Sequence, residues 1–96
     1  MLTGKQKRLL RAKANQLKPI FQVGKIGVNE NMVEQISEAL EKRELIKVSI
    51  LQNCMEDKDS VASKLSDGAE AEVVQIIGNN IVLYKESQEN KQIQLP

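Results

Sequence analysis

The sequence has no histidine, no tryptophan and only one cysteine, and these shortages exclude several classes of protein. A single cysteine cannot form an internal disulfide, and without histidine it supplies neither an ordinary zinc site nor histidine-based acid–base chemistry. One phenylalanine and one tyrosine are too few for the aromatic platform on which RNP-motif domains stack bases. We therefore expect no enzyme, no cofactor and no metal site.

Long apolar runs are also missing, which bears on where the protein works. No run approaches the ~20 residues of a membrane span, and residues 1–18 lack the apolar core of a secretory signal. We expect Cys54 to be a free buried thiol rather than a nucleophile, because no histidine could activate it. A chain of 96 residues suits one domain, and we expect it to be a monomer. Because a membrane span, a secretory signal and a disulfide are not indicated, we expect the protein to be cytoplasmic.

Acidic residues are absent from the first 25 positions, although the net charge of the whole chain is only +1. Residues 26–96 contain seven basic and thirteen acidic residues, a net charge of −6. The charge is thus separated along the sequence, which indicates an anionic partner for the N-terminal part. The seven basic residues of that part are Lys5, Lys7, Arg8, Arg11, Lys13, Lys18 and Lys25.

Helical periodicity predicts three helices. The first is capped by Thr3 with Gln6 three residues later, and it should end near Lys18 because Pro19 follows. The second begins after Asn29, a favourable N-cap. The third is capped by Asp57 or Asp59 and stops at Gly68.

Alternating and β-branched residues predict four strands. They cover residues 20–23, 46–51, 72–77 and 81–84. The resulting order is α-β-α-β-α-β-β, and its strand–helix–strand units require a parallel pair. The fold class is therefore α/β (α+β), a mixed four-stranded sheet with three helices. Residues 1–87 form the domain, and residues 88–96 form a polar, flexible tail.

The loop Gly24-Lys25-Ile26-Gly27 is the first candidate site. Two glycines permit close approach of a nucleic-acid backbone, as in the GXXG loop of KH domains, and a helix N-terminus follows. A tight strand-to-helix turn would also need glycine. The basic residues of the first helix form the second candidate, with a solvated face as the alternative.

Four stretches are similar to the YhbY-like family of the CRM class (chloroplast RNA splicing and ribosome maturation). They run in the family's order from residue 2 to about residue 86. These stretches are residues 2–8 (LTGKQKR), 23–28 (VGKIGV), 44–48 (ELIKV) and 75–84 (QIIGNNIVLY).

This resemblance implies a fold similar to the C-terminal domain of bacterial translation initiation factor three. It also implies binding to ribosomal RNA in precursors of the large (50S) subunit during ribosome assembly. The RNA-binding residues would be Gly24, Lys25, Ile26, Gly27, Lys5, Lys7, Arg8, Arg11 and Lys18.

Two other functions remain open at this point. One is a protein-docking module on a ribosomal protein or assembly GTPase, without direct RNA contact. The other is a DNA-binding domain, which the strand-loop-helix order does not favour because a helix-turn-helix reader is missing.

Overall fold

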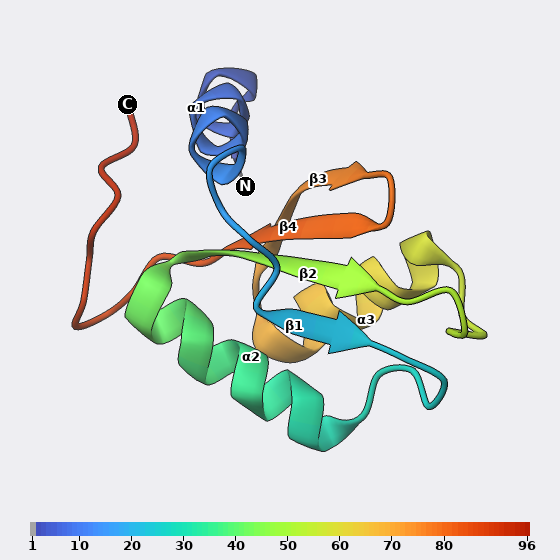
Figure 1. Ribbon diagram of the computed structural model, residues 1–96. Coiled ribbons are helices and arrows are strands. Elements are labelled where there is room, and N and C mark those ends of the chain that lie inside the picture. The colour runs from blue at the N-terminus through green and yellow to red at the C-terminus, as the bar shows by residue number, and fades with distance from the viewer. Residues whose placement is uncertain (1) are drawn as a thin grey trace.

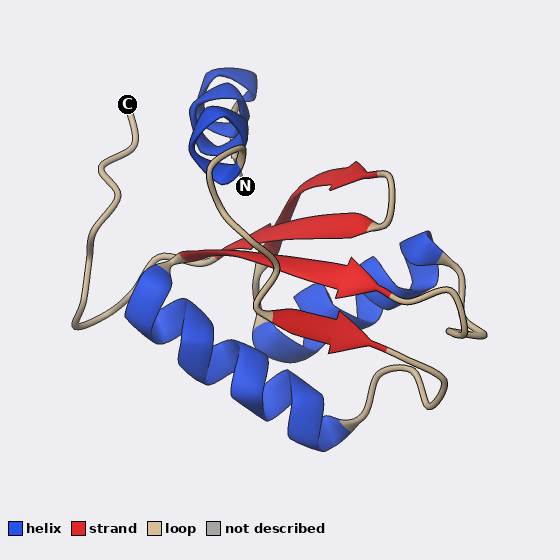
Figure 2. Cartoon of the chain, viewed as in Figure 1, coloured by secondary structure: helices blue, strands red, loops and turns tan. Residues whose placement is uncertain are grey.

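Three helices and four strands follow one another in the predicted order along residues 2–96, the part of the chain that the computed structural model describes (Figures 1 and 2). The strand boundaries differ from the predicted ones by at most one residue. The elements are α1 (Gly4–Ala14), β1 (Phe21–Val23), α2 (Glu30–Arg43), β2 (Leu45–Ile50), α3 (Lys58–Ala69), β3 (Glu72–Ile77) and β4 (Asn80–Tyr84).

The four strands form one mixed sheet in the order β1-β2-β4-β3, which confirms the predicted fold class. Strands β1 and β2 are parallel and are joined through α2, whereas β4 pairs antiparallel with both β2 and β3. Figure 1 shows α1 on one face of the sheet and α2 with α3 on the other. No helix among residues 2–96 is long and apolar enough to cross a membrane.

Each face of the sheet carries its own apolar cluster, because successive residues of a strand point to opposite faces. In β2, Ile46, Val48 and Ile50 pack against α2 and α3 in the larger cluster. Leu45 points the other way, into a smaller cluster with Leu10 of α1. The helix α1 is thus attached to the sheet through a separate, smaller core.

Helix α1 ends at Ala14, so the prediction that it extends to about Lys18 was wrong. The predicted cap is confirmed, since Thr3 and Gln6 each accept a hydrogen bond from the backbone amide of the other. At the other end, the amide of Leu17 donates to the carbonyl of Ala14, three residues back. This tighter turn leaves the helical path before Lys18, whose position next to proline disfavours the helical conformation.

Gly68 lies inside α3, so the prediction that the third helix stops at this glycine was wrong. The helix is capped by Asp57 and continues to Ala69, and Glu70 takes the left-handed conformation after it. A Cβ atom at Gly68 would lie 2.8 Å from Cγ1 of Val33 in α2. Glycine is needed here because α2 and α3 pack closely at this point.

The C-terminal residues lie against the end of α2, where two glutamates accept their backbone amides. Glu44 is fully buried and accepts from the amides of Ser87, Gln92 and Ile93. Glu41 accepts from the Ser87 hydroxyl and from the amides of residues 88 and 89. Ile93 is buried in the smaller cluster beside α1. The flexibility of residues 88–96 stays a prediction, but their position is defined.

We expect Gly68→Ala to stabilise the protein only when Val33 is also shortened. Alanine is favoured over glycine in a helix by about 1 kcal/mol, but the added methyl group meets a stiff β-branched side chain. Thermal unfolding should therefore show Val33→Ala/Gly68→Ala to be more stable than Val33→Ala. Gly4→Ala, with open space around the new methyl group, is the control. Equal stabilisation by Gly68→Ala in both backgrounds would contradict this packing.

The pH dependence of the tail contact should follow Glu41. The Ser87 hydroxyl first, and then the amides of Gln88 and Glu89, lower the pKa of Glu41 from 4.5 to about 2. Because the pKa is depressed, the stabilisation is complete above pH 4.5 and is lost as the pH falls toward 2. A carboxyl-carbon NMR titration should return this low pKa, and Ser87→Ala should raise it. A wild-type pKa near 4.5 would show that the contact does not form in solution.

Candidate nucleic-acid interface

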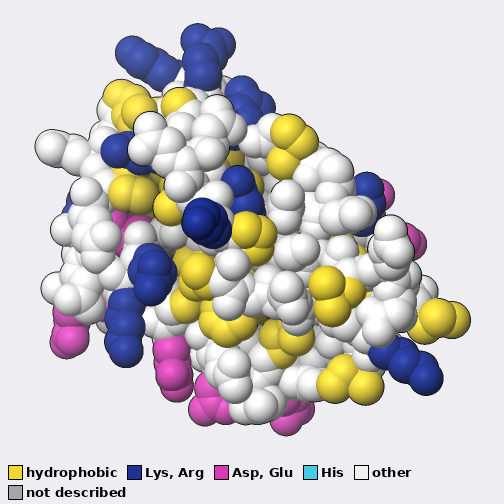
Figure 3. All heavy atoms as spheres, in the orientation of Figure 1, with side chains coloured by type: hydrophobic (Ala, Val, Ile, Leu, Met, Phe, Trp, Pro, Cys, Tyr) yellow, Lys and Arg dark blue, Asp and Glu magenta, His cyan; other side chains and the backbone are white. Residues whose placement is uncertain are grey.

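Basic side chains surround the outer side of α1, the helix that forms the outermost layer on its face of the sheet. Leu10 and Ala14 are buried on the side of α1 that faces the sheet. Lys5, Arg8 and Arg11 lie on its other sides and are exposed. Figure 3 shows Lys and Arg side chains gathered over α1, whereas many of the visible Asp and Glu side chains lie along the opposite rim over α2. The charge separation of the sequence is therefore also a separation in space.

Two basic residues lie apart from this outward group. Lys7 is half-buried on one flank of α1. Lys18 is exposed but belongs to the linker between α1 and β1, because the helix has ended before it. The structure thus assigns these predicted residues to three different settings. Lys5, Arg8 and Arg11 share the exposed surface of α1, on which Lys13 is exposed as well.

The loop Gly24–Gly27 connects β1 to α2 and is closed by a hydrogen bond from the Gly27 amide to the Gly24 carbonyl. Gly27 has a φ of +71°, which explains the second glycine of the motif. The two central side chains point into solvent, and Ile26 is 81% exposed. One positive charge, that of Lys25, lies beside a bare apolar side chain.

Glu56, in the segment between β2 and α3, occupies the exit of this loop. One carboxylate oxygen accepts from the Val28 amide at 3.2 Å, and Lys64 forms an ion pair with the other. A Cβ atom at Gly27 would overlap with this first oxygen. The hydrogen bond from Lys64 and then that from Val28 lower the pKa of Glu56.

The role of Glu56 was missed in the sequence. It stands beside Asp57 and Asp59, for which the sequence indicated only a helix cap. Asp57 is the cap, and it accepts from the amide of Ser60. Glu56 instead places a carboxylate where an incoming phosphate could otherwise meet the Val28 amide. Any phosphate at this loop must therefore bind on the side of Lys25, away from Glu56.

Helix α1 and the Gly24–Gly27 loop do not touch, but an open part of the sheet lies between them. Strand pairing aligns Gln22 with Ser49, and Ser49 with Asn80. Alternation along β2 puts Ser49 on the same face as Leu45, which is the α1 face. This polar row (Gln22, Ser49 and Asn80) crosses three strands just before the loop. Lys47 lies on the same face, one step nearer to α1.

The remaining chemistry of the described residues is limited. Cys54 is a free thiol that is half-buried rather than fully buried, with Sγ 3.6 Å from the Glu56 carbonyl oxygen. Within residues 2–96, no three His, Cys, Asp or Glu side chains gather closely enough to hold a metal ion. The arrangement of charges and polar groups is suited to binding an extended anion along one face.

Comparison with known proteins gives a consistent result. The sequence profile of the CRS1/YhbY (CRM) domain matches residues 2–85. The chain is 71% identical over 96 residues to the probable RNA-binding protein YqeI of Bacillus subtilis, and all of both chains is covered. It is 38% identical to an RNA-binding protein of Haemophilus influenzae, covering 99% of this chain and 95% of that one.

A solved structure has the same fold. The solution structure of a Staphylococcus aureus protein, described as a candidate RNA-binding protein, superposes with a TM-score of 0.83. The two chains are 58% identical, and each is covered completely.

The contact between Gly27 and Glu56 should be visible in stability measurements. Gly27→Ala and Gly78→Ala both force alanine into the left-handed region, which costs about 1–2 kcal/mol. Only the first variant also meets a carboxylate, since nothing lies within 4 Å of the new atom at Gly78. Urea unfolding should show Gly27→Ala to be the less stable variant. Glu56→Ala should reduce this difference, and an unchanged difference would mean that Glu56 does not occupy the loop exit.

Proposed function

The chain belongs to the CRS1/YhbY (CRM) domain family, and from that membership we propose that it is an RNA-binding protein, not an enzyme. Its target in this proposal is ribosomal RNA in precursors of the large subunit, bound in the cytoplasm during ribosome assembly. The protein acts as a monomer, and residues 1–87 are the binding domain. Relatives named as RNA-binding proteins support the general function.

The single observation that carries the proposal is the exposed basic surface of α1. Residues 2–25 contain no acid, so nothing on the helix neutralises its lysine and arginine side chains. An unscreened group of cations attracts polyphosphate, and each phosphate that is neutralised releases condensed counterions. The four glutamates of α2 give that helix a net negative charge, and acidic side chains lie along the rim opposite α1, which limits binding to the one face.

The bound RNA runs from α1 across the open face of the sheet to the Gly24–Gly27 loop. Lys7, Arg8, Arg11 and Lys5 of α1 hold phosphates at one end. Lys18 lies in the linker, and Lys25 with the backbone of Gly24, Ile26 and Gly27 meets the strand at the other end. The polar row provides hydrogen-bonding groups between them. Recognition therefore depends mainly on backbone and shape.

A protein-docking function on a ribosomal protein or assembly GTPase is the second candidate, and one observation favours it. Ile26 and Met55 are 81% and 85% exposed, on neighbouring loops at one end of the sheet. Exposed apolar side chains of this size often mark contacts between proteins. Ile26→Ser removes the apolar side chain without adding charge and separates the two candidates, because it should weaken docking to protein-containing particles more than binding to naked RNA.

Charge reversal on α1 should weaken RNA binding and lower its salt dependence. We expect Arg8→Glu and Arg11→Glu each to reduce affinity for structured ribosomal RNA about ten-fold, and to lower the log–log salt slope by about one or more. Lys42→Glu, on α2, makes the same change in charge and is the control. Gel shifts at several salt concentrations measure both effects. Equal losses in all three variants would contradict an α1 interface.

Sedimentation tests the ribosomal part of the proposal separately. The wild-type protein should travel with large-subunit precursors in a sucrose gradient of cell lysate. The Arg8→Glu/Arg11→Glu variant should remain at the top. If both forms travel with the particles, direct contact through α1 is not what holds them there. If neither does, RNA binding has another target.

A further inference from the structure

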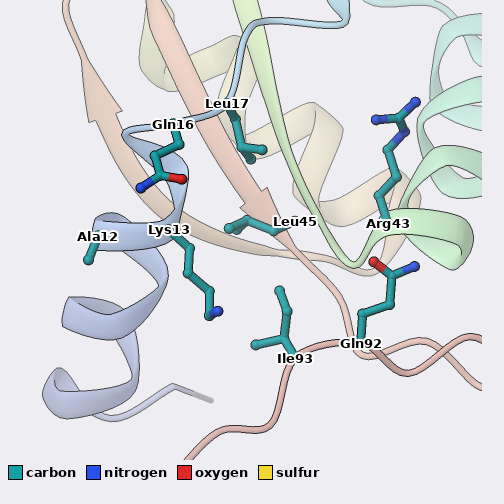
Figure 4. A pocket seen from close by; sticks show the side chains of 8 residues that line it. All are labelled: Ala12, Lys13, Gln16, Leu17, Arg43, Leu45, Gln92 and Ile93. Atoms are coloured by element: carbon teal, nitrogen blue, oxygen red, sulfur yellow. The ribbon is translucent and has the colours of Figure 1, made fainter.

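A groove of about 710 Å³ separates the end of α1 from the C-terminal residues, and the proposed RNA path does not account for it. It lies on the α1 face of the sheet, beside the smaller cluster. Figure 4 shows its side chains, which come from four parts of the chain.

The lining combines an apolar floor with positive sides. Leu17, Leu45 and Ile93 provide aliphatic surface at the bottom. Lys13 reaches in from α1, and Arg43 stands on the other side of Leu45 (Figure 4). None of the eight described lining residues is acidic, although residues 26–96 carry a net charge of −6. An apolar floor between two cations is suited to a flat ring with an attached phosphate.

Two glutamine side chains add hydrogen-bonding groups. Nε2 of Gln92 donates to the Lys42 carbonyl at the end of α2, which fixes the plane of the amide. In Figure 4 the nitrogen of Gln92 points toward α2 and its oxygen toward the groove. An oxygen held in this way accepts a hydrogen bond but cannot donate one. The amide of Gln16 lies on the opposite side, at the end of α1.

The wall that carries Gln92 and Ile93 is fixed before any ligand arrives. The amides of both residues donate to the buried carboxylate of Glu44. That carboxylate also accepts the Ser87 amide, so its charge is satisfied within the protein. Preorganised walls of this kind reduce the entropy that binding would otherwise cost.

We propose that this groove binds one unpaired nucleotide of the RNA strand that lies on α1. The base rests on Leu17, Leu45 and Ile93, and its exocyclic amino group donates to the Gln92 oxygen. The adjoining phosphates lie against Lys13 and Arg43. Adenine, cytosine and guanine carry an exocyclic amine. Uracil has only a ring N3–H, flanked by two carbonyl oxygens that would face the Gln92 oxygen, so uridine is the disfavoured nucleotide.

This inference rests on the proposed RNA binding and adds a preference for the base. It also assigns a binding role to residues 92 and 93, which lie outside the predicted binding domain. The partner needs both a ring and a phosphate, which distinguishes it from a simple polyanion.

The test measures binding of fluorescent oligoadenylate and oligouridylate, each about ten nucleotides long, to the full chain by anisotropy. Wild type should bind oligoadenylate about five-fold more tightly, as one neutral hydrogen bond allows. Gln92→Met removes the acceptor at similar volume and should abolish the preference. Gln94→Met, in the same tail but outside the groove lining, should keep it. Lys13→Gln/Arg43→Gln should weaken both oligonucleotides equally.

Equal binding of the two oligonucleotides by wild type would contradict the proposal that the groove binds a nucleotide. Identical behaviour of Gln92→Met and Gln94→Met would contradict it as well. Circular-dichroism melting shows whether Gln92→Met loosens the tail. In that case Lys13→Gln/Arg43→Gln, which leaves the tail hydrogen bonds intact, decides, and unchanged binding of both oligonucleotides by it would overturn the proposed groove site. If the groove variants do nothing while Arg8→Glu/Arg11→Glu weakens both oligonucleotides, the groove is wrong and RNA binding by α1 stands. If wild type binds neither oligonucleotide nor ribosomal RNA, both proposals fail together.

Discussion

The carboxylate of Glu44 fixes how the end of α2, the start of β2 and the C-terminal residues are arranged relative to one another. This residue joins α2 to β2 directly, with a φ of +65° and no exposed surface. Burial alone would raise its pKa, but the amides of Ser87, Gln92 and Ile93 outweigh burial and lower it. Its own carbonyl accepts the Lys85 amide after β4. Without this charge the tail would lose three backbone hydrogen bonds, two of which hold the wall of the groove.

Local patterns were enough to predict the fold, but contacts between distant residues were not visible in them. Periodicity predicted each helix and strand, since one apolar face must be buried whatever covers it. Gly68 was mistaken for a helix stop because its reason, Val33, lies 35 positions away. The attachment of the polar C-terminal residues was not predicted, because no local pattern indicates that Glu41 and Glu44 accept their amides.

The candidate interface, like the fold, could be predicted from the sequence only in part. The acid-free basic segment and the two glycines can be recognised from residue types alone, and the structure exposes Arg8, Arg11 and Lys25. Glu56 could not be recognised, because its partner amide is 28 positions earlier. The groove was equally hidden, since it forms only when Lys13, Arg43 and Gln92 are brought together. The sequence thus predicts which charged residues are present, and tertiary packing determines which of them lie next to one another.

The division into two apolar clusters has a consequence for the order of folding during synthesis. Every residue of the larger cluster lies between Val23 and Leu83, so that core can form while the end of the chain is still being made. The smaller cluster needs Leu10 and Ile93 together. Helix α1 is synthesised first, but Val74, Val82 and Tyr84, against which it packs, lie in β3 and β4. Until β4 has left the exit tunnel, the most basic segment of the chain lacks most of its packing surface, and Ile93 then completes the cluster.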